Sequence, residues 1–290
     1  MKKARACSVA TRLAVLALAC LLAGGGIGLA SDVYTLRFQV TGPLVDPATC
    51  LYLNWGDELL FFNSTQQPQT VRLLGVSNLP AAPNPQDLVI PAGRSRALGG
   101  TALNWYPASG AYIWAVHLDV PDGVAISSRL EVHAGIGAPC PISGDNRVFG
   151  ALPIRVFREL TPPNVAQYHL GTDLGASTNS FGGPANARIS VGVYNAGAVD
   201  GHATIQVRKG CDDLPFDTRH LTIPANTLTQ VSGLPAGSTD CTFPESAEPY
   251  APPVSSSYVV VTIDQPSFSY AISASNELPP KIPVGVSFTQ

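Results

Sequence analysis

Residues 55–71 read WGDELLFFNSTQQPQTV, and this stretch contains two strand patterns separated by a turn. An apolar run ends at Phe62-Asn63, a polar segment follows, and a second run begins at Thr70-Val71. Short runs of this kind, bounded by Asn, Ser and Pro, are typical of β-strands and the turns between them. The stretch therefore predicts two successive strands of an all-β protein.

The composition of the whole chain agrees with that prediction. The 290 residues include 26 prolines and 27 glycines, and only 13% are charged. Helical patterns with a charged face are absent, whereas short apolar or alternating runs recur between turn residues. About 260 residues follow residue 30, which suits two domains of ordinary size. We therefore predict two β-sandwich domains, at residues 31–140 and 154–290, joined by a turn-rich linker at residues 141–153.

The predicted strands follow the apolar and alternating runs. In the first domain they cover residues 33–40, 50–53, 58–63, 69–75, 88–90, 94–98, 110–117 and 127–133. In the second domain they cover residues 154–160, 187–195, 203–209, 219–223, 228–232, 257–264 and 268–275, with a further strand at 286–288. Prolines interrupt residues 80–85, which are predicted as a loop.

The first 30 residues have the features of a secretory signal peptide. Four basic residues precede an apolar run at residues 13–23, and small residues lead to Ala30, after which we expect cleavage. A lipoprotein signal at Cys20 is the alternative, and the apolar run that continues past this cysteine argues against it. The run is shorter than the roughly 20 residues that a membrane span needs, and no later segment is long enough. The sequence thus predicts a secreted or periplasmic protein without a membrane span.

The exported part of the chain is acidic and contains four cysteines. Loss of residues 1–30 removes four of the 17 basic residues and none of the 20 acidic ones, which leaves a net charge of −7. Nucleic acids and anionic membranes bind clustered positive charge, so neither is an expected partner. Four cysteines allow three pairings. The simplest has one disulfide in each domain, Cys50–Cys140 and Cys211–Cys241.

Two motifs in the first domain indicate a family that the chain resembles. The first motif comprises Gly56-Asp57 and Phe62-Asn63, followed by a turn and a second strand. The second motif is GAYIWAV at residues 110–116, followed by Gly123-Val124 and a final strand. With both motifs, residues 33–134 resemble the cupredoxin family, whose members are Greek-key β-sandwiches that bind copper. The resemblance implies a cupredoxin-like fold for the first domain.

The same resemblance implies where copper ligands would lie, and those positions hold other residues. A blue-copper site needs two histidines and a cysteine thiolate, usually with a weakly bound methionine. No cysteine lies between Cys50 and Cys140, and the only methionine is Met1, so the site cannot form. We therefore expect a cupredoxin-like scaffold without copper electron transfer and without a cofactor. The degenerate copper positions are Gln69 and His117 for the histidines, Val116 for the cysteine and Val124 for the methionine.

Two histidines leave a second interpretation open. His117 and His133, with a carboxylate such as Asp119 or Asp122, are residue types that bind zinc or non-blue copper. In that case the protein is a periplasmic metal-handling accessory protein. Histidines on neighbouring strands more often serve in packing or at the surface, so we expect no metal.

The second domain resembles the immunoglobulin-like modules of secreted bacterial proteins. The resemblance rests on the alternating strand ARISVGVYNAG (residues 187–197) and its hairpin partner GHATIQVRKG (residues 201–210). Modules of that kind usually act as spacers or adhesive surfaces, and the resemblance implies such a role here.

Known catalytic motifs are absent from the sequence, among them G-x-S-x-G, S-x-x-K with its partners and H-E-x-x-H. His169 lies four residues before Asp173 and near Ser177, but no nucleophile, base and orienting group are defined together. We interpret it as a loop histidine. The carboxylates at residues 212–217 are interpreted as solvated turn residues. A non-enzymatic protein is the prediction, and an extracellular hydrolase is the second alternative.

Aromatic residues in a loop are the clearest functional signal. Trp105-Tyr106 lies in a segment rich in Gly and Pro, and such residues are favoured anchors for protein or sugar partners. The alternative is that Trp105 covers the end of the sandwich. Asn63-Ser64-Thr65 also matches an N-glycosylation sequon. The sequence as a whole predicts a secreted, non-enzymatic structural or adhesive protein that contacts a protein or a glycan, and it leaves the oligomeric state open.

Overall fold

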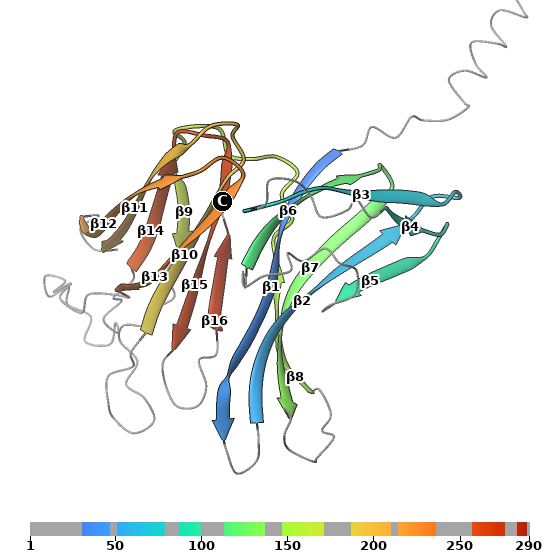
Figure 1. Ribbon diagram of the computed structural model, residues 1–290, viewed down its shortest axis with the longest axis horizontal. Helices are drawn as coiled ribbons and strands as arrows, with labels where there is room; N and C mark the ends of the chain where they lie inside the picture. The colour runs from blue at the N-terminus through green and yellow to red at the C-terminus, as the bar shows by residue number, and fades with distance from the viewer. Residues whose placement is uncertain are drawn as a thin grey trace, which may run out of the picture.

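The computed structural model describes residues 31–46, 51–78, 87–99, 113–136, 147–170, 187–209, 214–235, 257–275 and 283–288. Every regular element within these ranges is a β-strand, and the strands form two β-sandwich domains (Figure 1). The fold class predicted from the sequence is confirmed. No helix in the described part of the chain is long and apolar enough to cross a membrane.

The strands of each sandwich follow one another along the chain. The first sandwich contains β1 (Ser31–Asp46), β2 (Leu51–Asn63), β3 (Gln69–Val76), β4 (Leu88–Ile90), β5 (Ser95–Gly99), β6 (Ile113–Val120), β7 (Val124–Ile136) and β8 (Arg147–Ile154). The second contains β9 (Gln167–Leu170), β10 (Ala187–Asn195), β11 (Gly201–Lys209), β12 (Pro215–Ile223), β13 (Thr227–Pro235), β14 (Ser257–Ile263), β15 (Ser267–Ser275) and β16 (Pro283–Phe288). β4 and β10 have the bounds that the sequence predicts.

Two regions differ from the prediction. Residues 147–153, predicted as part of the linker, belong to β8 and pair with β7, whereas residues 155–160 are not the strand that we predicted. His169, predicted in a loop, lies in β9, which pairs with β14. β8 contains Gly150 and Pro153, and as an edge strand it tolerates these residues, which otherwise indicate turns. β9, also an edge strand, has only four residues.

In the first sandwich one sheet has the strand order β4-β3-β6-β1, and the other has the order β5-β2-β7-β8. β1 belongs to both sheets, since residues 31–38 pair with β6 and residues 39–46 pair with β2. In the second sandwich the orders are β12-β11-β14-β9 and β13-β10-β15-β16. All these pairings are antiparallel, as expected for strands joined by short turns.

The second sandwich repeats all but one of the strand pairings of the first. β9–β16 pair with one another as β1–β8 do, except that β1 also pairs with β2 whereas β9 does not pair with β10, so that β10 corresponds to β2, β14 to β6 and β15 to β7. The correspondence extends to single residues. Asn63 ends β2 and Asn195 ends β10, and each is followed by the hairpin into the next strand. One module is thus present twice, and Phe62 and Tyr194 occupy equivalent positions in its two copies.

Each sandwich has its own core of inward-facing apolar residues. The alternation that β-strands require is clear in β3, where Val71 and Leu73 are buried while Arg72 and Leu74 are exposed. Burial of each large apolar side chain contributes about 1.5–3 kcal/mol. Each sandwich is therefore stabilised by the burial of apolar side chains in its own core.

A third apolar core lies between the sandwiches. The outer face of the β4-β3-β6-β1 sheet contributes Leu36, Phe38 and Ala115, and the outer face of the β13-β10-β15-β16 sheet covers them with Phe268 and Tyr270. Figure 1 shows these two sheets side by side at the centre of the molecule. The sandwiches are joined through a shared core rather than by the connecting chain alone.

The segment that connects the sandwiches is hydrogen-bonded to both of them. Phe157 exchanges two backbone hydrogen bonds of 2.8 Å with Tyr34 of the first sandwich. Thr161 exchanges two, of 2.8 and 3.1 Å, with Ser267 of the second. The Phe157 ring also stacks on Phe268, with ring centroids 4.5 Å apart. We call residues 155–166 the connector.

Candidate functional site

The four degenerate copper positions lie on three strands, and the structure does not bring them together. Gln69 begins β3, whereas Val116 pairs with Val76 at the far end of that strand. Six or seven residues of an extended strand span about 20 Å. Val116 is buried in the core of the first sandwich, and Val124 begins β7. These positions therefore form no common site.

His117 lies at the margin of the interface between the sandwiches. Its ring stacks on Tyr34, with centroids 4.3 Å apart and planes 9° from parallel. Its Nε2 atom lies 3.1 Å from Oδ1 of Asp32. Burial, and then the charge of Asp32, raise the pKa of Tyr34. His133 lies in β7, on the other sheet. Among the described residues, no group of three or more His, Cys, Asp or Glu side chains is placed to hold a metal ion.

His169 belongs to a chain of buried hydrogen bonds between the two sheets of the second sandwich. Its Nε2 atom lies 2.7 Å from Oγ of Ser269, and that hydroxyl donates to Oε1 of Gln167 at 2.6 Å. Gln167 donates in turn to Oγ of Ser267 at 2.8 Å. A serine and a histidine in contact are the parts of a nucleophile–base pair. All four residues are fully buried, however, so this pair joins β9 to β15 and faces no solvent.

Of the other residues considered for catalysis, only Asp217 lies in the described part of the chain. Its carboxylate accepts a hydrogen bond of 3.1 Å from Arg219, two residues further along β12. Asp173, Ser177, Asp212 and Asp213 lie outside the described residues. The same holds for the predicted aromatic anchors Trp105 and Tyr106, and for the four cysteines Cys50, Cys140, Cys211 and Cys241.

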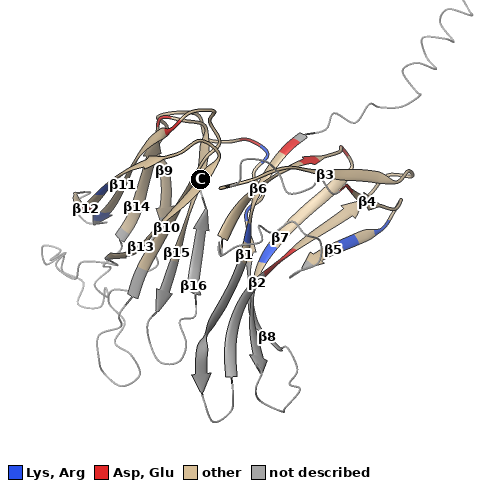
Figure 2. Cartoon of the chain, in the orientation of Figure 1, with Lys and Arg blue, Asp and Glu red and all other residues tan. Residues whose placement is uncertain are grey.

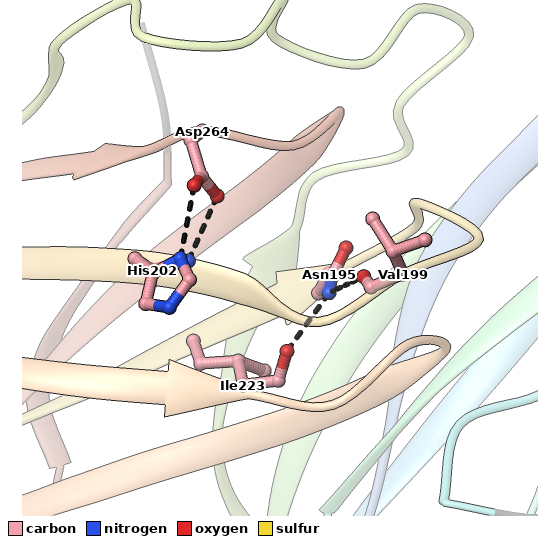
Figure 3. Close-up of polar contacts among 5 residues, drawn as sticks. All are labelled: Asn195, Val199, His202, Ile223 and Asp264. Atoms are coloured by element: carbon pink, nitrogen blue, oxygen red, sulfur yellow. Dashed lines mark hydrogen bonds and ion pairs between the residues drawn. The ribbon is translucent and has the colours of Figure 1, made fainter.

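Asn63 and Asn195 hold the equivalent turns of the two modules. The Asn63 amide donates to the carbonyls of Gln67 (2.8 Å), Ile90 (3.0 Å) and Pro91 (3.2 Å). The Asn195 amide donates to Val199 (2.9 Å), Ile223 (2.9 Å) and Pro224 (3.2 Å), as Figure 3 shows for the first two. Both side chains are fully buried. The sequon at Asn63 is therefore closed to modification in the folded protein.

Asp264 makes a second polar contact near the Asn195 turn (Figure 3). Its Oδ1 accepts a hydrogen bond of 2.8 Å from the backbone N–H of His202, and its Oδ2 lies 3.1 Å from Nδ1 of the same residue. The backbone hydrogen bond, followed by the side-chain one, lowers the pKa of Asp264. This contact ties the start of β11 to the turn after β14.

The Gly56-Asp57 motif has a structural role. Asp57 forms an ion pair with Arg37, and both side chains are fully buried between β1 and β2. Its other oxygen accepts a hydrogen bond of 2.9 Å from the backbone N–H of Phe38. A buried ion pair needs such additional hydrogen bonds to offset its desolvation. Asp57 therefore anchors the first strand of the module and takes no part in a surface site.

The outer face of the β5-β2-β7 sheet carries an exposed apolar surface. Leu60 and Phe62 are 40% and 43% exposed. Ala97 lies beside Leu60 on β5, and Ala125 lies beside Phe62 on β7, both exposed. We call these four residues the β2 patch. An ion pair of 2.7 Å between Glu58 and Arg129 borders it. Figure 2 shows how few charged residues the strands of either sandwich carry.

The sequence of β2 also contains a pattern that indicates the β2 patch. A strand with one face in solvent alternates apolar and polar residues, but residues 59–62 read LLFF. Leu59 and Phe61 are fully buried in the core, so Leu60 and Phe62 must point outward. A run of this kind on a half-buried strand indicates a surface that contacts something else.

Comparison of the chain with protein-family models, with curated proteins and with solved structures gives no significant match.

Proposed function

We propose that the chain is a secreted or periplasmic, non-enzymatic structural or adhesive protein that binds a partner through the outer face of its first sandwich. The observation that carries the proposal is the β2 patch, where two large apolar side chains stand in solvent on a regular strand. Side chains of that kind form the centre of protein interfaces and also stack on sugars. A protein or a glycan is the proposed partner.

The rigidity of the molecule supports a structural role. The two sandwiches share an apolar core, and the connector is hydrogen-bonded to both. A binding surface on a rigid frame loses little conformational entropy when it binds. The Ser269–His169 pair, the one described contact that resembles a catalytic dyad, is closed to solvent and does not favour a hydrolase.

The family of each sandwich is part of the proposal. Residues 33–134 resemble cupredoxins and the second sandwich resembles immunoglobulin-like modules, but the two share one pairing pattern. One module type therefore accounts for both halves better than two families do. We propose that the first sandwich is a scaffold whose Gln69, Val116, His117 and Val124 have no metal-binding role.

Disulfides in both domains also belong to the proposal. Leu51, next to Cys50, pairs with Ile136, four residues before Cys140, which supports a Cys50–Cys140 bridge at that end of β2 and β7. Cys211–Cys241 is the pairing that remains. Mass mapping of the exported protein without reduction tests both, and a peptide that links Cys50 to Cys211 or Cys241 contradicts them.

A photo-crosslinking amino acid in place of Phe62 tests the binding surface in the cells that make the protein. The matched control carries the same group in place of Val89, which is 48% exposed on β4. A covalent adduct at residue 62 and none at residue 89 supports the proposal. A glycan array with labelled wild type and Phe62→Asp tests the sugar alternative. Absence of both adduct and glycan signal contradicts the proposed function.

A titration with Cu(II), Cu(I) and Zn(II) tests the metal-handling alternative directly. Micromolar binding that is lost in His117→Ala or His133→Ala would replace our proposal with that alternative. The proposal expects binding no tighter than millimolar and no difference between the variants and the wild type.

A further inference from the structure

The two modules of the chain join through unlike faces. The first module uses the outer face of its β4-β3-β6-β1 sheet, and the second uses the outer face of its β13-β10-β15-β16 sheet. We call these the front face and the back face of a module. A contact between unlike faces of two equivalent units leaves one front face and one back face unused, and it can be repeated without closing.

The β2 patch is the unused back face of the first module. Phe62 occupies the position that Tyr194 has in the second module, since each directly precedes the buried asparagine of its turn. Ala125 likewise corresponds to Phe268. Asn63 pairs with Val124, directly before Ala125, and Asn195 pairs with Ser267, directly before Phe268. Tyr194 and Phe268 are buried against the first module, whereas Phe62 is 43% exposed. The apolar face is thus covered in one copy of the module and open in the other.

The unused front face of the second module presents an equivalent aromatic residue. Tyr34 lies opposite His117 on β6, and Tyr168 lies opposite Val260 on β14, at the same register in the two modules. Tyr34 meets Tyr194 across the interface, with ring centroids 6.2 Å apart. Tyr168 is 51% exposed, whereas its counterpart Tyr34 is partly covered by the second module.

We propose that the β2 patch binds the Tyr168 face of a second copy of this chain, so that chains associate head to tail. The contact repeats the one inside each chain, with Phe62 of one copy against Tyr168 of the next, as Tyr194 lies against Tyr34. This inference rests on the proposed function and names its partner. Because the contact does not close on itself, the association extends beyond a dimer as concentration rises.

Two variants test the direction of the contact. Phe62→Asp blocks the back face of the first module, and Tyr168→Asp blocks the front face of the second. Sedimentation equilibrium of the mature protein over a concentration series should show a mass that rises past the dimer for the wild type. Each variant alone should remain monomeric. An equimolar mixture of the two should form a heterodimer and nothing larger, since each variant keeps the face that the other lacks.

Val89→Asp is the matched control, because Val89 is comparably exposed but lies on neither unused face; it should assemble like the wild type. Thermal unfolding of every variant verifies that it folds, and Phe62→Thr replaces Phe62→Asp if the latter does not. A wild type that is monomeric at every concentration overturns the proposal. So does a Tyr168→Asp variant that still forms dimers, which would indicate two β2 patches facing each other.

The outcomes separate this inference from the proposed function. A monomeric wild type that gives a crosslink to another protein at residue 62, or a glycan signal lost in Phe62→Asp, overturns self-association and leaves the binding function standing. A monomeric wild type with neither signal overturns both.

Discussion

At the scale of single residues, the side-chain amides of Asn63 and Asn195 hold the equivalent turn in each module. Each closes a turn by donating to carbonyls of two segments, one of them about thirty residues away. The oxygen of each amide also accepts from the turn itself, at Thr65 or Gly197. No other side chain of similar size offers both donors and acceptors in this geometry.

Replacement of either asparagine by alanine should therefore destabilise its sandwich. Asn63→Ala leaves the carbonyls of Ile90 and Pro91 without this donor, and a buried group left unpaired costs about 1–3 kcal/mol. We expect a loss of roughly 2–3 kcal/mol in the free energy of unfolding, measured by denaturant titration. Gln66→Ala, which removes an exposed amide from the same turn, should cost less, and a smaller effect of Asn63→Ala than of this control would contradict the role given to Asn63.

Asp264 should make stability depend on acid pH. Its pKa in the folded protein lies below the ordinary value of 3.8, so the stabilisation is fully present above that value and is lost as pH falls through the lowered pKa. Asp264→Asn should melt at a lower temperature than the wild type at about pH 6, and the difference should shrink toward about pH 2. Melting curves over a pH series measure this, and a difference that does not change with pH would count against it.

The residue scale is also where the sequence predicted least. Gly56-Asp57 and Phe62-Asn63 belong to the motif that resembles a copper-binding scaffold, but that resemblance does not indicate what these residues contact. Asp57 pairs with Arg37, 20 residues earlier in the chain, and Asn63 donates to Ile90, 27 residues later. A local motif does not reveal such partners, so the roles became visible only when the strands were paired.

At the scale of elements, periodicity predicted most strands because one face of each packs on a core. β3 follows the alternation closely. β9 was missed because four residues are too few to show a period, and its His169 and Gln167 are polar although buried. The repeat of the module was also missed. The two copies share a pairing pattern rather than a sequence, apart from the turn asparagines and the Ile-Pro-Ala turns at residues 90–92 and 223–225.

Gly192 in β10 should be the strand glycine least tolerant of change. A Cβ atom at this position would lie 2.1 Å from the Tyr270 ring, so the ring would have to leave its buried place at the interface. Gly192→Ala should cost about 1–3 kcal/mol of stability, as overpacking does elsewhere. Gly75→Ala is the control, since a Cβ there meets only His117 at an ordinary 3.8 Å. Equal stabilities of the two variants, measured by denaturant titration, would refute this account.

At the scale of the whole molecule, the shared core should make the two sandwiches unfold together. Phe268 is fully buried in that core, where it stacks on Phe157 of the connector and contacts Tyr194, its neighbour on β10. Phe268→Ala should cost about 3–5 kcal/mol and weaken the coupling. Calorimetry should show one transition for the wild type and two for the variant. Two transitions in the wild type would mean that the interface contributes little.

A pair of asparagines reinforces the same interface and explains its fixed geometry. Asn78 and Asn226 both have positive φ angles, of 65° and 50°, which asparagine tolerates better than most residues. The backbone N–H of Asn78 donates to the carbonyl of Asn226 at 2.9 Å, and its side-chain oxygen accepts from the N–H of Leu228 at 2.8 Å. Neither the apolar pattern nor the turn residues predicted this contact, since it joins residues about 150 positions apart.

The connector has a consequence for how the protein responds to proteases. Proteases that separate domains usually cut the segment between them, because they need several residues of free backbone. Phe157 and Thr161 give both of their backbone groups to neighbouring strands, and the Phe157 side chain is buried. A protease could therefore reach this segment only after the interface had opened. Cleavage into separate halves is therefore as rare an event as the opening of the shared core.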